Sequence, residues 1–310
     1  MAVLDGARLG RSLTMPASLP PILRSDTFLA WLFVITWGSG YLASKIGLAS
    51  APPFTFLTLR LTLGMLVLLP WLLISPPRWP ASWKSLMHIC VAGLLMHAVN
   101  LSGSHYAQYL GMSAGITALL LATQPLLTAG FASWKMGERL GPPQWLGIFL
   151  GLAGVTLVVW HKVDVREASI ASLIAVAISL LAITSGTLYQ RVFCPNVDLR
   201  SASFCQFGIS VLLLIPLAWS VEGFAVDWRW QLPAALLFLV VFGSLIATNI
   251  LHYLMRRGQA AKVTSLLFLT PIVAVILEWA LFQVSPSALA MAGIAITCAG
   301  VALVTVRRTR

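Results

Sequence analysis

Long runs of apolar residues dominate the chain, and they recur ten times along its length. A helix needs about 20 apolar residues to cross a hydrocarbon layer about 30 Å thick. Prolines and glycines separate several of the runs, as expected for turns between helices. The pattern predicts an all-α integral membrane protein with ten transmembrane helices, at 27–48, 53–75, 85–106, 112–134, 143–161, 168–190, 200–220, 231–254, 261–283 and 287–306.

Composition supports this prediction and excludes several classes of protein. Of the 310 residues, 59% are hydrophobic and 9% are charged, and the mean hydropathy is +0.90. Soluble domains carry about 25% charged residues, and disordered chains carry few apolar ones. The net charge of +11 comes from basic residues scattered between apolar runs, so we expect no nucleic acid partner. The four cysteines form no close metal-type pair, and we expect no metal and no cofactor.

The distribution of Lys and Arg predicts the orientation of the chain in its membrane. With the N-terminus inside, fifteen basic residues fall in the inside segments, and three, Lys162, Arg166 and Arg229, fall outside. Cytoplasmic loops of membrane proteins carry an excess of this kind. We therefore expect a multi-pass protein of the cytoplasmic (inner) membrane, with both termini in cytoplasmic tails at 1–26 and 307–310.

The second half of the chain repeats the first at an offset of 146 residues. Between 113–160 and 259–306, 11 of 48 aligned pairs are identical, and Pro125 aligns with Pro271. Each proline should kink its span near the middle, which would suit helices that bend during gating. Because each half has five spans, an odd number, the second half must enter the membrane inverted, as in many secondary transporters. The predicted five-helix repeats occupy 27–161 and 168–306.

Several motifs resemble those of one transporter family. They are WGSGYLASK (37–45), TLRLTLG (58–64), SAGITALLLATQPLLTAGFASWKMGERL (113–140), GIFLGLAGVTLV (147–158), QAAKVTSLLFLTPIVAVILEW (259–279) and GIAITCAGVALV (293–304). In order and spacing they resemble EamA-type domains of the drug/metabolite transporter superfamily. The resemblance implies a ten-helix exporter of small metabolites or drugs. It also implies a central cavity lined by spans 1, 3, 4, 6, 8 and 9.

Polar side chains lie along one face of several predicted spans, at 100° per residue. An unpaired polar group costs free energy in lipid, so these faces must contact protein or water. Hydrogen bonding between helices, without a role in solute binding, would produce the same pattern. The candidate residues for solute binding in the cavity are Trp37, Ser39, His97, Asn100, Gln108, Gln124, Thr128, Gln190, Asn249, His252 and Tyr253.

Charged residues within or at the ends of the spans are candidates for coupling or gating. Arg60 and Glu278 each cost at least ~2.5–3 kcal/mol near the centre of a bilayer. Their similar depth allows a salt bridge between them. Glu278 is the better candidate for proton coupling, with a structural hydrogen bond as the alternative. Lys45 and Arg191 align in the two halves and would lie at opposite faces of the membrane.

Together these features predict a secondary transporter that exports small metabolites, such as amino acids or related amphipathic solutes and drugs, by alternating access. The sequence has no P-loop, so a gradient drives it, through proton antiport or facilitated exit. An uptake carrier and a channel-like facilitator are the alternatives. The spans hold no HExxH, GxSxG or paired-carboxylate pattern, so an enzyme is not expected. The expected partners are the solute, the lipid bilayer, protons, and a second copy bound through the glycine-bearing spans 143–161 and 287–306.

Overall fold

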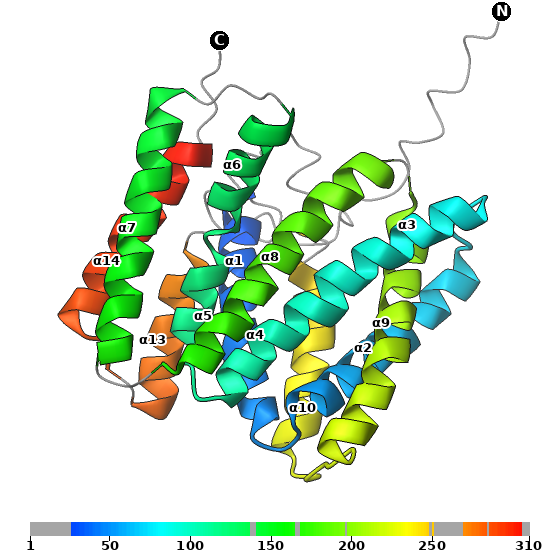
Figure 1. The fold of residues 1–310 in the computed structure, drawn as a ribbon. Helices are drawn as coiled ribbons and strands as arrows, with labels where there is room; N and C mark the ends of the chain where they lie inside the picture. The colour runs from blue at the N-terminus through cyan, green and yellow to red at the C-terminus, as the bar shows by residue number, and fades with distance from the viewer. Residues whose placement is uncertain are drawn as a thin grey trace, which may run out of the picture.

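The computed structural model describes residues 26–136, 141–164, 168–195, 197–247, 250, 269–283 and 285–305. Every regular element in this part of the chain is helical (Figure 1). In chain order the elements are α1 (Asp26–Leu48), α2 (Pro53–Ile74), α3 (Trp83–Gly93), η2 (Leu94–Val99), α4 (Asn100–Tyr109), α5 (Ala114–Leu121), α6 (Gln124–Met136), α7 (Pro142–Asp164), α8 (Ile170–Phe193), α9 (Leu199–Glu222), α10 (Gln231–Phe238), η3 (Leu239–Ala247), α13 (Thr270–Phe282) and α14 (Ala288–Thr305).

Several helices have the length and composition of membrane spans. Within the described residues, four are long and apolar enough by themselves: Pro53–Ile74, Trp83–Tyr109, Ile170–Phe193 and Leu199–Glu222. Shorter apolar helices lie at Ala114–Thr128, Gln231–Ser244, Thr270–Phe282 and Ala288–Leu303. Large apolar side chains also face outward, such as Leu73 with 72% and Trp219 with 71% of their surface exposed. A surface of this kind suits lipid rather than water, so the protein is a helical membrane protein.

The helices pack in pairs that join distant parts of the chain. α7 lies along α14 and α2 lies along α9, and the two pairs stand on opposite sides of the molecule (Figure 1). Between them, α1 packs against α13, α10 and η3, while α8 packs against α4, η2 and α6. Apolar side chains fill the interfaces between these helices, and the largest fully buried ones include Phe33, Phe56, Leu57, Leu119 and Leu232.

Glycines bring α7 and α14 into backbone contact. A Cβ atom added to Gly300 would lie 2.3 Å from the backbone nitrogen of Gly151, and one added to Gly154 would lie 2.6 Å from that of Thr297. Only residues without a side chain allow helices to approach so closely. The small-residue faces of the two helices are therefore buried against each other inside one chain. The glycines thus hold α7 against α14, and a second copy bound through these two helices would have to contact their other faces.

Two helices contain a π-helical segment at matching places in the two halves. η2 separates α3 from α4, and η3 continues directly from α10. η3 begins 145 residues after η2, close to the offset of the sequence repeat. π-helical turns are rare and concentrate at functional sites. Nothing in the hydrophobic pattern predicted either of them.

A two-residue turn interrupts span 4 between α5 and α6. α5 ends at Leu121 and α6 begins at Gln124, so Pro125 lies in the first turn of a new helix. Pro271 has the same place, because α13 begins at Thr270. In the first turn the missing N–H of proline removes no hydrogen bond of the helix. Pro125 therefore follows a two-residue turn inside its span, whereas the residues just before Leu269 lie outside the described part of the chain, so the expected kink at Pro271 stays a prediction.

Hydrogen bonds tie the connecting segments together at the two ends of the bundle. At one end, the backbone N–H of Asp227 donates to the carbonyl of Ser50 at 2.8 Å. At the other end, the guanidinium of Arg200 donates to the carbonyl of Ser75 at 2.9 Å. In Figure 1 the first end lies below and the second above. We call them the lower end and the upper end.

Candidate functional site

An ion pair joins α1 to α13 near the lower end. Nζ of Lys45 donates to Oε1 of Glu278 at 2.5 Å. The Glu278 side chain is almost buried, at 4% exposed, while that of Lys45 is 31% exposed. The Lys45 ammonium also lies 4.8 Å from the ring centroid of Phe282. Either charge alone would be poorly compensated in these surroundings, so the pair holds the two helices together.

The same carboxylate also binds the start of α5. Oε1 of Glu278 accepts a hydrogen bond from the backbone N–H of Ala114 at 3.2 Å, and Oε2 accepts one from Gly115 at 3.1 Å. The first N–H groups of a helix have no partner within the helix, and negative charge beside them is favourable. Glu278 therefore connects three helices, α1, α5 and α13.

A second carboxylate, on α9, binds the start of α2 in a similar way. Glu222 accepts hydrogen bonds from the backbone N–H of Phe54 at 2.9 Å and from that of Thr55 at 2.7 Å. It also accepts one from the Thr55 hydroxyl at 2.7 Å. Unlike Glu278, it has no cationic partner in the described part of the chain. Glu222 was not predicted, although a single acidic residue at the end of an apolar run was a usable signal.

Arg60 does not pair with Glu278. Nη1 of Arg60 instead lies 3.5 Å from Nε2 of His105 on α4. The reason is the packing order, since α2 contacts α9 and α4 while α13 contacts α1 and α5. The salt bridge that the similar depth of Arg60 and Glu278 allowed is therefore not formed, and Lys45 takes the place of the arginine.

A chain of polar side chains links η2, α9 and α8. Nε2 of His97 lies 3.3 Å from Oε1 of Gln206, and Nε2 of Gln206 donates to Oε1 of Gln190 at 3.1 Å. Since an amide oxygen only accepts, the imidazole is the donor in the first contact. Gln206 is 5% exposed and was not predicted. Its signal in the sequence is a large amide inside the apolar run 200–220.

Other predicted cavity residues are satisfied by neighbouring helices or by their own backbone. Asn100 accepts a hydrogen bond from the hydroxyl of Ser179 at 2.8 Å, and Gln124 donates to the hydroxyl of Thr187 at 3.1 Å. These contacts match the alternative of hydrogen bonding between helices. Two hydroxyls donate to carbonyls three or four residues earlier in their own helices, those of Ser39 and Thr128.

The remaining predicted residues are not gathered with this polar group. Trp37 is half-buried against an apolar cluster, with its ring 5.4 Å from that of Phe33. Arg191 is exposed in the last turn of α8, at the upper end. Three predicted residues lie outside the described part of the chain: Asn249, His252 and Tyr253.

Gln108 and Arg60 differ from the satisfied polar residues. Gln108 is only 6% exposed, and within the described residues neither its amide nitrogen nor its amide oxygen has a hydrogen-bond partner. Nε of Arg60 is also buried and has no partner in the part of the chain that the structure describes. Buried polar groups in proteins are nearly always hydrogen-bonded, so these atoms need an explanation.

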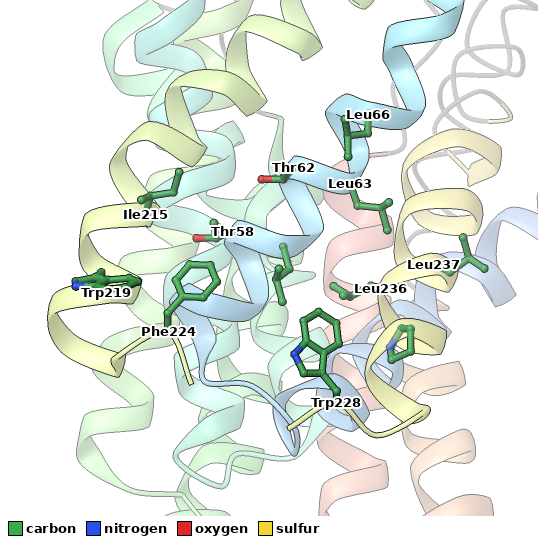
Figure 2. A pocket seen from close by; sticks show the side chains of 12 residues that line it. Thr58, Thr62, Leu63, Leu66, Ile215, Trp219, Phe224, Trp228, Leu236 and Leu237 are labelled. Atoms are coloured by element: carbon green, nitrogen blue, oxygen red, sulfur yellow. The ribbon is translucent and has the colours of Figure 1, made fainter. Parts of the chain in front are cut away.

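A groove of about 750 Å³ opens at the side of the bundle, between α2, α9 and α10 (Figure 2). None of the predicted site residues lies in its wall. Hydrocarbon matches such a wall better than a polar solute does, so we do not assign it to solute binding. The lining residues are mostly apolar and include Leu63, Leu66, Ile215, Trp219, Trp228 and Leu236.

Comparison with known protein families decides the class of protein. The EamA-like transporter family matches the chain twice, at residues 25–160 and 170–306. The chain belongs to the EamA-like transporter family. The two matched segments cover both halves of the sequence repeat, and they confirm the resemblance found in the motifs.

Similar proteins carry transporter names. This EamA-like transporter is 29% identical over 248 residues to the uncharacterized inner membrane transporter YedA of Escherichia coli K12, covering 78% of each chain. It is 29% identical over 267 residues to the uncharacterized transporter YvbV of Bacillus subtilis, covering 83% of each. A WAT1-related chloroplastic protein of Arabidopsis thaliana is 28% identical over 90% of this chain and 70% of its own. These similarities indicate transport rather than an enzymatic reaction.

A solved structure supports the fold of this EamA-like transporter. The crystal structure of one protein superposes with a TM-score of 0.61 at 21% sequence identity. The match covers 92% of this chain and 99% of the other. Identity at this level concerns the arrangement of helices alone.

Proposed function

We propose that this EamA-like transporter exports small metabolites across the cytoplasmic (inner) membrane by alternating access. Its solutes are amino acids or related amphipathic molecules, including drugs, and a proton gradient drives their exit. The two halves, 27–161 and 168–306, act as inverted five-helix repeats, so that the chain crosses the membrane ten times. The observation that carries this proposal is that several helix contacts within the described residues are preserved when the two halves are exchanged.

The contacts of α1 and α8 illustrate this exchange. At the offset of the sequence repeat, α1 corresponds to α8, α6 to α13, and η2 to η3. α1 packs against α13 and η3, and α8 packs against α6 and η2, which are the corresponding elements. In addition, α2 packs against α9 and α7 against α14, so each of these helices contacts its own counterpart. Such contacts are expected around a pseudo-two-fold axis between inverted repeats.

Basic residues support a cytoplasmic upper end. Arg78, Lys84 and Arg200 lie in or beside the segments that form this end, and Arg191 lies in the last turn of α8 there. Arg229 is the basic residue in the described segment that follows α9 at the lower end. Because Lys and Arg accumulate in cytoplasmic loops, the lower end faces outward in this proposal.

The ion pair of Lys45 and Glu278 supplies a closing contact at the outward end. While it is formed, α1, α5 and α13 are held together and the space between the halves is shut to the outside. Protonation of Glu278 removes the charge that Lys45 and two backbone N–H groups bind. The three helices then separate and release the solute outward, which couples export to proton entry. Arg191 occupies the equivalent position at the cytoplasmic end.

Counterflow in proteoliposomes tests transport and its direction. Vesicles preloaded with one unlabelled amino acid or drug should transiently accumulate the same radiolabelled solute above its equilibrium level. A channel-like facilitator would show no such accumulation. With acid outside, proton antiport accelerates efflux, whereas an uptake carrier that works by proton symport would accelerate influx. If no solute tested shows counterflow, the proposed transport function is wrong.

Cysteine labelling tests the orientation. In a variant without the native cysteines, Ala81→Cys and Ala225→Cys place one thiol at each end of the bundle, and both positions are exposed. A membrane-impermeant maleimide added to intact cells should label Ala225→Cys and spare Ala81→Cys. Labelling of both positions from the same side would contradict the inverted arrangement.

A further inference from the structure

Arg60 has no acidic partner in the described part of the chain. It lies on α2, about 10 Å from the lower end of that helix at 1.5 Å per residue. A cation at this depth is costly unless a charge or several acceptors compensate it. The carboxylates whose side chains the structure describes all have other partners: Asp198 binds Arg200, Asp227 binds Arg229, Glu278 binds Lys45, and Glu222 binds the start of α2.

His105 orients the guanidinium of Arg60 without neutralising it. Nδ1 of His105 lies 2.8 Å from the carbonyl oxygen of Leu101 and must donate to it, because a carbonyl only accepts. In the neutral ring, Nε2 then carries no proton, and it faces Nη1 of Arg60 at 3.5 Å. The ring of Phe56 lies 5.7 Å from the imidazole. His105 thus positions the guanidinium of Arg60, and its positive charge stays available to a negatively charged ligand.

Gln108 adds an unused polar group on the same helix. It follows His105 by three positions on α4, so the two side chains are neighbours on one helix face. The amide of Gln108 is buried, and both its nitrogen and its oxygen lack partners among the described residues. A buried amide and a buried Nε of Arg60 without partners indicate that a polar ligand completes the site.

We propose that Arg60 and Gln108 bind the carboxylate group of the transported solute, with His105 as a positioning residue. The inference rests on the proposed transport function and adds the chemical class of the solute, a small molecule with a free carboxylate. The guanidinium of Arg60 offers a planar fork of N–H donors that fits two carboxylate oxygens. The amide NH₂ of Gln108 offers a further donor. The carboxylate supplies the negative charge that the described side chains do not.

Thermal unfolding of the purified full-length protein in detergent tests the binding. The probes are the standard amino acids, benzoate and phenylacetate, each compared with its carboxamide. At least one carboxylate should raise the unfolding midpoint by several degrees, since a ligand that binds the folded state stabilises it. Its carboxamide, which keeps the shape and loses the charge, should leave the midpoint unchanged. Equal stabilisation by sodium chloride would assign the site to an inorganic anion and overturn the proposal.

Variants assign the binding to these residues. Arg60→Gln should abolish the shift, and Arg60→Lys and Gln108→Leu should each weaken the affinity about tenfold, or about 1.4 kcal/mol. His105→Leu should weaken it too, while His105→Gln, which keeps an acceptor for Arg60, should restore it. Arg229→Gln is the control, because it removes an exposed arginine outside the site and should change nothing. Should Arg60→Gln fail to fold, the affinities of the Arg60→Lys and Gln108→Leu variants decide.

The outcome separates this inference from the transport proposal. If a carboxylate and its carboxamide bind equally well, or if all the site variants keep the affinity of the native protein, the carboxylate site is wrong. Counterflow of a solute without a carboxylate would then leave the transport function standing. If no solute shows counterflow and a carboxylate still binds through Arg60, the transport proposal fails and the site remains.

Discussion

The carboxylate of Glu278 binds the ammonium group of Lys45 at 2.5 Å and also accepts hydrogen bonds from two backbone N–H groups at the start of α5. One side chain therefore carries both an ion pair and a helix start. Glu222 binds the start of α2 without a cation in the described residues. In that part of the chain Glu278 has a lysine partner and Glu222 does not. Comparing the two glutamates therefore separates the effect of the ion pair from the effect of capping a helix.

Replacement of Glu278 by glutamine should remove the response of transport to a pH gradient. The amide oxygen of Gln still accepts one hydrogen bond, but it no longer binds a proton in the working range. We expect counterflow without a pH gradient to persist. Export under a pH gradient should fall to the rate measured without the gradient. Glu222→Gln is the matched control and should lower stability while keeping the pH response. Full gradient-driven export by Glu278→Gln would refute proton coupling at this residue.

Removal of Lys45 should destabilise the protein more when Glu278 is present than when it is absent. Lys45→Ala leaves a nearly buried carboxylate without its cation, which costs about 3–5 kcal/mol for buried pairs. In a Glu278→Gln background the same change should cost less, with a coupling energy of about 1–3 kcal/mol. Reversible unfolding in mixed micelles measures all four proteins of the cycle. Additive effects of the two substitutions would contradict the ion pair.

Gly300 should not tolerate alanine. The added Cβ atom would lie 2.3 Å from the backbone nitrogen of Gly151, and neither backbone can move without separating α7 from α14. We expect a loss of about 1–3 kcal/mol, as for overpacked cores. Gly130→Ala is the control, because a Cβ atom there meets nothing within 4 Å and alanine favours the helix. Unfolding midpoints of the two variants should therefore shift in opposite directions.

Acid should weaken the upper end through Asp198. Burial acts to raise the pKa of this carboxyl, but hydrogen bonds from Arg200 and from the backbone N–H of Arg78 outweigh it, so the pKa lies below its usual value. Because the pKa is lower in the folded protein, ionised Asp198 stabilises the fold above about pH 4. This contribution is lost as the pH falls through the folded pKa.

The Asp198→Asn variant tests this dependence. It should unfold at a lower temperature than the native protein at pH 7, and the difference should shrink as the pH falls from about 5 to 3. Arg200→Gln should show the same convergence, since it removes the donor that holds the carboxylate. A difference that stays constant down to pH 3 would exclude the ionised form of Asp198 as its source.

The helices that could be predicted from the sequence are those that the hydrophobic pattern alone determines. α2, α8 and α9 cover predicted spans because uninterrupted apolar runs of this length have no other stable form in lipid. The break before Pro125 was not predictable to that degree. A proline removes one hydrogen bond, and the sequence does not say whether the helix bends around it or starts again at it.

The partners of polar residues were harder to predict than their presence. Arg60 and Glu278 were recognised as unusual, but depth alone could not decide which helices adjoin. Lys45 was expected near the outer face and was not connected with Glu278, because that contact depends on the packing of α1 against α13. Gln206 was missed since one amide in an apolar run has no periodic pattern to mark it.

The close approach of α7 and α14 determines how the molecule can move. With no side chain between Gly151 and Gly300, these two helices cannot slide or rotate past each other without losing the contact. We therefore expect the two helices to move as one unit, and rearrangement to take place among the other helices. Spin labels across this pair would keep a constant separation through the whole cycle, while labels on α1 and α8 would report the change.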